Sequence, residues 1–93
     1  MTAEFKLILL KEKTNLGKVV VETVSNNISI ILNPDKKQDY EPLFKIIVAE
    51  LTRKEGLHCA YEGLTIRNPP ELFLTALSQT LLLNFGILLQ KEN

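Results

Sequence analysis

The spacing of apolar residues changes after the first third of the chain, and this change constrains the fold most. Between Phe5 and Leu32, apolar side chains alternate with polar ones or are β-branched, which is typical of β-strands. From Tyr40 to Leu51 they recur every three or four residues, as on one face of a helix. The sequence therefore predicts a mixed domain in which strands come first.

The strand-like part contains two turn signals. Residues 14–17 form a predicted turn in which Gly17 can adopt a positive φ. Asn26-Asn27 is a predicted two-residue hairpin turn, because Asn tolerates left-handed backbone. Asn33-Pro34 ends the segment, since Pro has no N–H for a ladder. The three predicted strands are residues 5–9, 18–25 and 28–32.

Two helices are predicted, each with start and stop signals. The first covers 39–55, with Asp39 as N-cap, Pro42 in the first turn and Gly56 just past the end.

The second predicted helix begins at Asn68-Pro69-Pro70-Glu71, where Asn68 would be the cap, and it stops before Gly86. Between the helices, residues 57–67 form either a small hairpin (58–61 and 64–67) or one bulged strand. Residues 87–90 are either a last strand or a frayed continuation of the helix.

These elements predict a single α+β domain over residues 1–93. We expect a small, mainly antiparallel sheet, ordered β-β-β-α-β(β)-α-β, with two helices packed on one face. The alternative is a split βαβ arrangement, as in a ferredoxin fold, in which the second helix crosses back before the last strand. The expected core is Phe5, Leu7, Leu9, Val19, Val21, Ile28, Ile30, Leu43, Phe44, Ile47, Leu51, Phe73, Leu77 and Leu81.

Charge and cysteine content exclude several classes of protein. The 93 residues carry 11 basic and 11 acidic side chains, and 45% of them are apolar. This composition rules out a disordered polyelectrolyte and argues against strong non-specific nucleic-acid binding. Cys59 is the only cysteine, so no intrachain disulfide forms. With no signal-peptide pattern at the start, we expect a cytoplasmic protein.

The last predicted helix has an unusually wide apolar face. At 100° per residue its apolar positions span about 220°, whereas a helix on a sheet needs roughly 100–150°. Three interpretations compete: a helix buried between sheet and first helix, a homodimer or protein interface, and a membrane segment over Leu72–Gln90. The last is least favoured because polar residues interrupt the stretch.

The interface interpretation names particular side chains. Asn84 lies inside the apolar arc, and an unpaired buried amide is costly. We therefore expect it to be hydrogen-bonded, either to a backbone edge or to its own copy across a two-fold axis. The alternative is that Asn84 lies in the last helical turn and faces water. The interface candidates are Leu74, Leu81, Asn84, Phe85 and Leu88.

Catalytic and metal-binding patterns are weak. His58 and Cys59 would point to opposite faces of a strand, which prevents a dyad. The acids of the loop after the third strand, Asp35, Asp39 and Glu41, do not have EF-hand spacing. We therefore expect no catalytic residues, no cofactor and no metal site.

The leading functional hypothesis is a non-catalytic protein-interaction or assembly module, homodimeric or a small subunit of a larger assembly. A second hypothesis is a nucleic-acid-binding regulator that uses lysines of the first hairpin. A third is a small enzyme or ligand binder whose site forms between subunits. The lysines of the second hypothesis are Lys6, Lys11, Lys13 and Lys18, and the residues of the third are His58, Tyr61 and Glu62.

Overall fold

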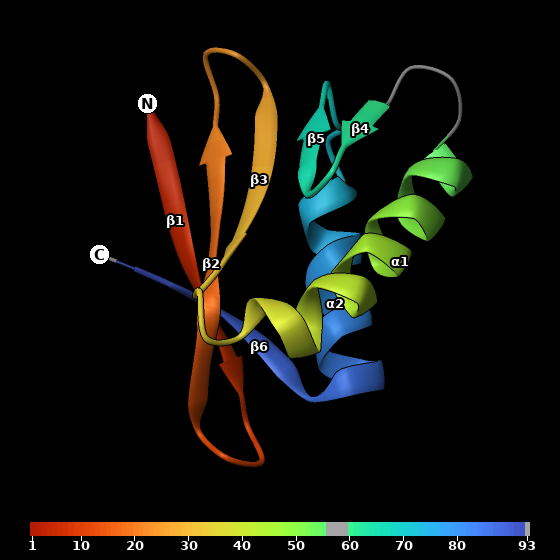
Figure 1. The fold of residues 1–93 in the computed structure, drawn as a ribbon. Coiled ribbons are helices and arrows are strands. Elements are labelled where there is room, and N and C mark those ends of the chain that lie inside the picture. Colours follow the sequence, from red (N-terminus) through yellow and green to blue (C-terminus); the bar gives the residue numbers. More distant parts are fainter. Residues whose placement is uncertain (56–59, 93) are drawn as a thin grey trace.

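The chain folds as an α+β domain with both helices on one face of an antiparallel sheet, as expected (Figure 1). The computed structural model describes residues 1–55 and 60–92. In these residues the sheet has six strands in the order β4-β5-β3-β2-β1-β6. The elements are β1 (Thr2–Leu9), β2 (Thr14–Glu22), β3 (Asn27–Leu32), α1 (Lys37–Glu55), β4 (Ala60–Glu62), β5 (Thr65–Arg67), α2 (Phe73–Phe85) and β6 (Ile87–Lys91).

The topology combines the two expected arrangements. The first three strands form an antiparallel meander, and each neighbouring pair in the sheet is antiparallel. Because β5 lies between β3 and β4, those two strands run in the same direction and α1 joins them by a split crossover. The second helix, α2, then crosses from β5 to β6, which lies at the opposite edge of the sheet.

The first turn lies earlier than predicted. Residues 10–13 form it, with Lys13 at φ 56°, whereas 14–17 belong to β2. A β-bulge shifts the register, since Leu7 pairs with Gly17 but Ile8 pairs with Asn15. The extra residue, Leu16, is completely buried.

Gly17 does adopt a positive φ, of 149°, although in the bulge rather than in a turn. A Cβ at this position would lie 2.1 Å from the carbonyl oxygen of Ile31, so only glycine fits.

The loop between β2 and β3 covers residues 23–26, so the predicted two-residue Asn-Asn turn is wrong. Asn26 is left-handed, at φ 56°, but Asn27 already pairs in β3. Asn26 also explains why Asn68 does not cap α2. The Asn26 Nδ2 group donates to Asn68 Oδ1 at 2.9 Å, and the Asn68 N–H donates to the Asn26 carbonyl at 2.9 Å. Asn68 thus ties a sheet loop to the end of β5.

The helix starts differ from the prediction, while the end of α2 agrees with it. α1 begins two residues early, so Asp39 lies in its first turn instead of capping it, and Pro42 lies inside the helix. α2 begins only at Phe73, with Leu72 at the cap position and no side-chain cap bond. It stops at Gly86, which is left-handed at φ 65°. The predicted stop at Gly56 lies outside the described residues.

The ambiguous segments are resolved in favour of strands. β4 and β5 form the small hairpin, with Tyr61 opposite Ile66, although residues 57–59 lie outside the described part. Residues 87–91 form β6, which pairs with β1 from Phe5 to Leu9.

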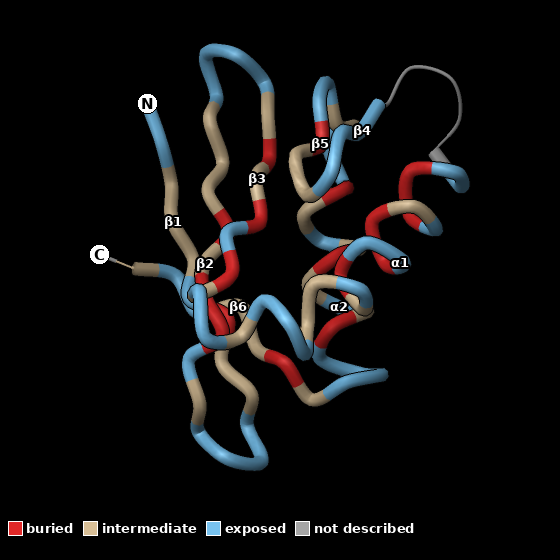
Figure 2. Tube along the Cα trace, viewed as in Figure 1, coloured by how far each residue is buried: buried red, intermediate tan, exposed pale blue. Residues whose placement is uncertain are grey.

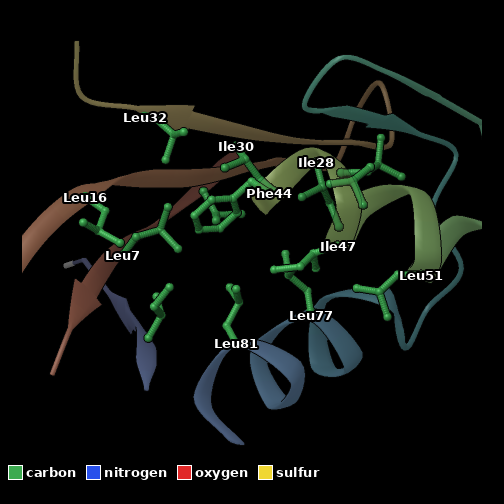
Figure 3. Packing of buried hydrophobic residues seen from close by; sticks show 14 of the residues in the cluster. Leu7, Leu16, Ile28, Ile30, Leu32, Phe44, Ile47, Leu51, Leu77 and Leu81 are labelled. Carbon is green, nitrogen blue, oxygen red and sulfur yellow. The ribbon is translucent and has the colours of Figure 1, made fainter. Parts of the chain in front are cut away.

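A single hydrophobic core lies between the sheet and the two helices (Figure 3). Each predicted core residue is buried in it or packed against it. Five buried hydrophobic residues of the described chain were not predicted: Leu16, Leu32, Val48, Ile66 and Ile87. Thr52 is the one buried polar residue in the described chain, and its hydroxyl donates to the Val48 carbonyl at 2.8 Å.

Candidate interaction surface

Of the residues proposed for a site between subunits, the structure describes Tyr61 and Glu62. His58 and Cys59 lie outside the described residues. Tyr61 and Glu62 are exposed neighbours on β4, and the Glu62 carboxylate lies 3.3 Å from the Arg67 guanidinium. In the described ranges, no buried side-chain nitrogen or oxygen is without a partner. Thr52 is the one buried polar residue in these ranges, so the described interior holds no polar cluster.

Three acidic residues of the loop and of α1, namely Asp35, Glu41 and Glu50, form ion pairs on the surface. Asp35 faces Lys36 at 3.9 Å, and Glu41 faces Lys45 at 3.3 Å. A hydrogen bond from Arg53 lowers the pKa of the Glu50 carboxyl, which is solvent-exposed. Within residues 1–55 and 60–92, no three His, Cys, Asp or Glu side chains are grouped as metal ligands would be.

The hairpin lysines are divided between two places. Lys6 and Lys18 are register partners on the sheet face that the helices leave open, where the Lys18 ammonium lies 3.1 Å from the Glu4 carboxylate. Lys11 and Lys13 lie in the turn between β1 and β2. Glu4 thus neutralises part of the expected patch.

In the described helices, most of the exposed large apolar residues lie on α2 and its cap. Figure 2 shows how buried and exposed stretches alternate along the helices. Only one stripe of α2 is fully buried, formed by Phe73, Leu77 and Leu81. Four large apolar residues of α2 and its cap remain exposed, and we call them the outer α2 surface: Leu72 (71% exposed), Leu82 (40%), Leu83 (80%) and Phe85 (38%).

The predicted interface residues occupy different surroundings. Leu81 is completely buried in the core, so it offers no surface to a partner. Leu74 is half-buried, whereas Asn84 and Phe85 are exposed near the end of α2. Leu88 does not continue the helical arc: it lies on β6 opposite Ile8, on the open face of the sheet.

Leu82 is not among the interface residues predicted from the sequence, although it is 40% exposed. A shallow hollow beside α2 shows which part of the sheet the Leu82 side of the helix faces. Its lining combines helix and sheet residues: Phe5, Leu74, Thr75, Ser78, Gln79 and Leu89. Seven residues are nearly two helical turns, so Leu82 continues the line of Thr75, and Phe85 continues that of Ser78. Leu82 and Phe85 therefore lie on the flank of α2 that faces the β1–β6 side of the sheet.

β6 is the strand at this side of the sheet, and within the described residues its only neighbour is β1. The Gly86 carbonyl accepts from the Leu10 N–H, and the Glu92 N–H donates to the Glu4 carbonyl, both at 2.9 Å. Backbone groups alternate in direction along a strand, so even-numbered residues of β6 point to β1. The N–H and C=O groups of Ile87, Leu89 and Lys91 consequently point outward.

Comparisons with known proteins identify no relative, because no protein-family model, curated protein or solved structure matches the chain. None of the helices in the described part of the chain combines the length and apolar character needed to cross a membrane.

Proposed function

We propose that this protein is a non-catalytic assembly module that forms a homodimer through its C-terminal part. The observation that carries the proposal is the contrast within α2. Its buried stripe already anchors the helix to the sheet, yet Leu72, Leu82, Leu83 and Phe85 remain exposed around the rest of it. Exposed apolar surface of this kind is typical of a protein-binding site. The lack of a polar cluster in the described interior also favours binding over catalysis.

Light scattering at high micromolar concentration tests this proposal. We expect a mass of twice the 10.5 kDa of the chain, and a return toward 10.5 kDa in the double variant Leu82→Lys/Leu83→Lys. Ile46→Lys is a matched control, because Ile46 is an apolar residue of α1 that is 63% exposed but lies outside the outer α2 surface.

The control should keep the wild-type mass, and all variants should keep the wild-type far-UV circular dichroism. A wild-type protein that stays at 10.5 kDa throughout the concentration range contradicts the proposal.

A further inference from the structure

We propose that the partner is a second copy of this chain and that the two copies pair along β6, antiparallel, across a two-fold axis at Leu89. This inference rests on the proposed homodimer and specifies how it is built. The outcome is one continuous sheet with the two α2 helices side by side on the same face.

The backbone of β6 is complementary to itself in this register. Its outward groups belong to Ile87, Leu89 and Lys91, which are evenly spaced about Leu89. An antiparallel partner places Leu89 opposite its own copy, and Ile87 opposite Lys91 of the partner. Each of these pairs exchanges two N–H to C=O hydrogen bonds, so each outward group of the three residues is satisfied.

The side chains of β6 do not oppose this pairing. From Ile87 to Gln90 the strand has no charge, no proline and no bulge, the devices that normally block a sheet edge. Lys91 is the only charged residue in β6. The two Lys91 positions are four residues apart along the paired strands, about 14 Å at roughly 3.4 Å per residue. That exceeds the screening length of about 8 Å at physiological salt.

The helix layer supplies the remaining contact area. A stable dimer buries roughly 800 Å² on each partner, which is more than a five-residue strand can supply. The hollow between Leu74 and Leu89 lies beside the β6 edge, and Leu82 and Phe85 continue along that flank of α2. A two-fold axis at Leu89 brings this flank against its own copy and covers the hollow.

The outward N–H of Lys91 gives a selective test by sedimentation equilibrium of the full chain. Lys91→Pro removes that N–H but no bond to β1, since the residue's backbone points away from β1. Lys91→Ala removes the charge and keeps the N–H, so it is the matched control. We expect Lys91→Pro to weaken dimerisation at least about tenfold relative to Lys91→Ala, because each copy loses a hydrogen bond.

Two results overturn the inference in distinguishable ways. If Lys91→Pro and Lys91→Ala dimerise equally well while Leu82→Lys/Leu83→Lys is monomeric, the β6 pairing is wrong and the proposed assembly through α2 stands. If the wild-type chain is monomeric at high micromolar concentration, both the pairing and the proposed function are wrong. Thermal melts of both Lys91 variants should show an intact fold, because Lys91 is exposed at the end of β6.

Discussion

The two edges of the sheet differ in length, charge and cover. In the part of the chain that the structure describes, β4 comprises three residues, Ala60–Glu62, and it ends in an ion pair between Glu62 and Arg67. β6 has five residues and carries no charge before Lys91. Short and charged edges resist pairing with other chains, whereas long apolar edges favour it. By this criterion β4 is an edge strand that resists pairing, whereas β6 is an edge strand to which another strand can be added.

The two helices differ as the two edges do: the outer side of α1 is mainly charged, and that of α2 is mainly apolar. α1, which contacts β3 and β4, carries ion pairs such as Glu50–Arg53 on its outer side, and Ile46 is the apolar exception. α2, which contacts β6, has Leu82 and Phe85 exposed on the flank beside that strand. At the β6 end, the exposed apolar residues of α2 therefore lie beside a strand whose Leu88 and Leu89 are half-buried.

The largest expected effect is a loss of stability when a buried side chain of α2, the helix beside β6, is truncated. Leu81→Ala deletes a completely buried side chain of α2 and should lower the free energy of unfolding by about 2–5 kcal/mol. Leu83→Ala, at an 80% exposed position of the same helix, should change it by less than about 0.5 kcal/mol. Urea denaturation of monomeric samples at low concentration measures both. Equal losses would show that the burial pattern of α2 is wrong.

A smaller effect is expected from a charge on the flank beside β6. Leu82→Lys should weaken dimerisation by about tenfold or more, since an interface lysine would be desolvated without a partner. Leu83→Lys places the same charge on the other flank and should leave the dimer affinity within about threefold. Sedimentation equilibrium compares the two variants. A stronger effect from Leu83 than from Leu82 would move the interface away from β6.

Removing the charge of Glu62 on β4, the opposite edge strand, should have little effect on stability or on oligomeric state. Glu62→Ala removes the ion pair with Arg67, which is exposed, so the free energy of unfolding should change by no more than about 0.5 kcal/mol. The mass in solution should not increase, because the described part of β4 has only three residues. New oligomers of Glu62→Ala would show that charge, rather than length, blocks this edge.

The smallest effect is expected at Asn84, which is exposed in the last turn of α2. It is seven residues from Leu77 and so lies on a different side of the helix from Leu82. Asn84→Leu should therefore leave both the melting temperature and the dimer mass nearly unchanged. If the variant instead forms a mixture of oligomers, Asn84 pairs with its own copy across the interface.

Local patterns predicted much of the fold because period and end signals are properties of short segments. The alternation of β1 and the three-to-four spacing of α1 each depend on a dozen residues or fewer, and Gly86 needs only its own backbone freedom. The predictions failed where a distant partner decides the outcome. Asn68 resembles a helix cap in sequence, but it bonds instead to Asn26, 42 residues away. Leu16 is buried because a bulge opposite Leu7 adds a residue to β2.

The candidate surface was only partly predictable for a related reason. The wide apolar arc indicated that α2 has more apolar residues than its contact with the sheet buries. It could not distinguish Leu81, which is buried in the core, from Phe85, which is exposed. Leu82 was missed because the side of α2 that meets the sheet depends on where β6 lies. The open edge itself has no local signature, since the sequence does not tell which strand is last in the sheet order.

Hydrogen exchange at β6 tests the central claim most directly. In a monomer the amides of Leu88 and Gln90, which point to β1, should be protected, while those of Leu89 and Lys91 exchange freely. If two copies pair along β6, raising the concentration from low to high micromolar should protect the amides of Leu89 and Lys91 as well, and leave those of Leu88 and Gln90 unchanged. Alternating protection that persists at all concentrations, in a sample that light scattering shows to be dimeric, would contradict pairing along β6.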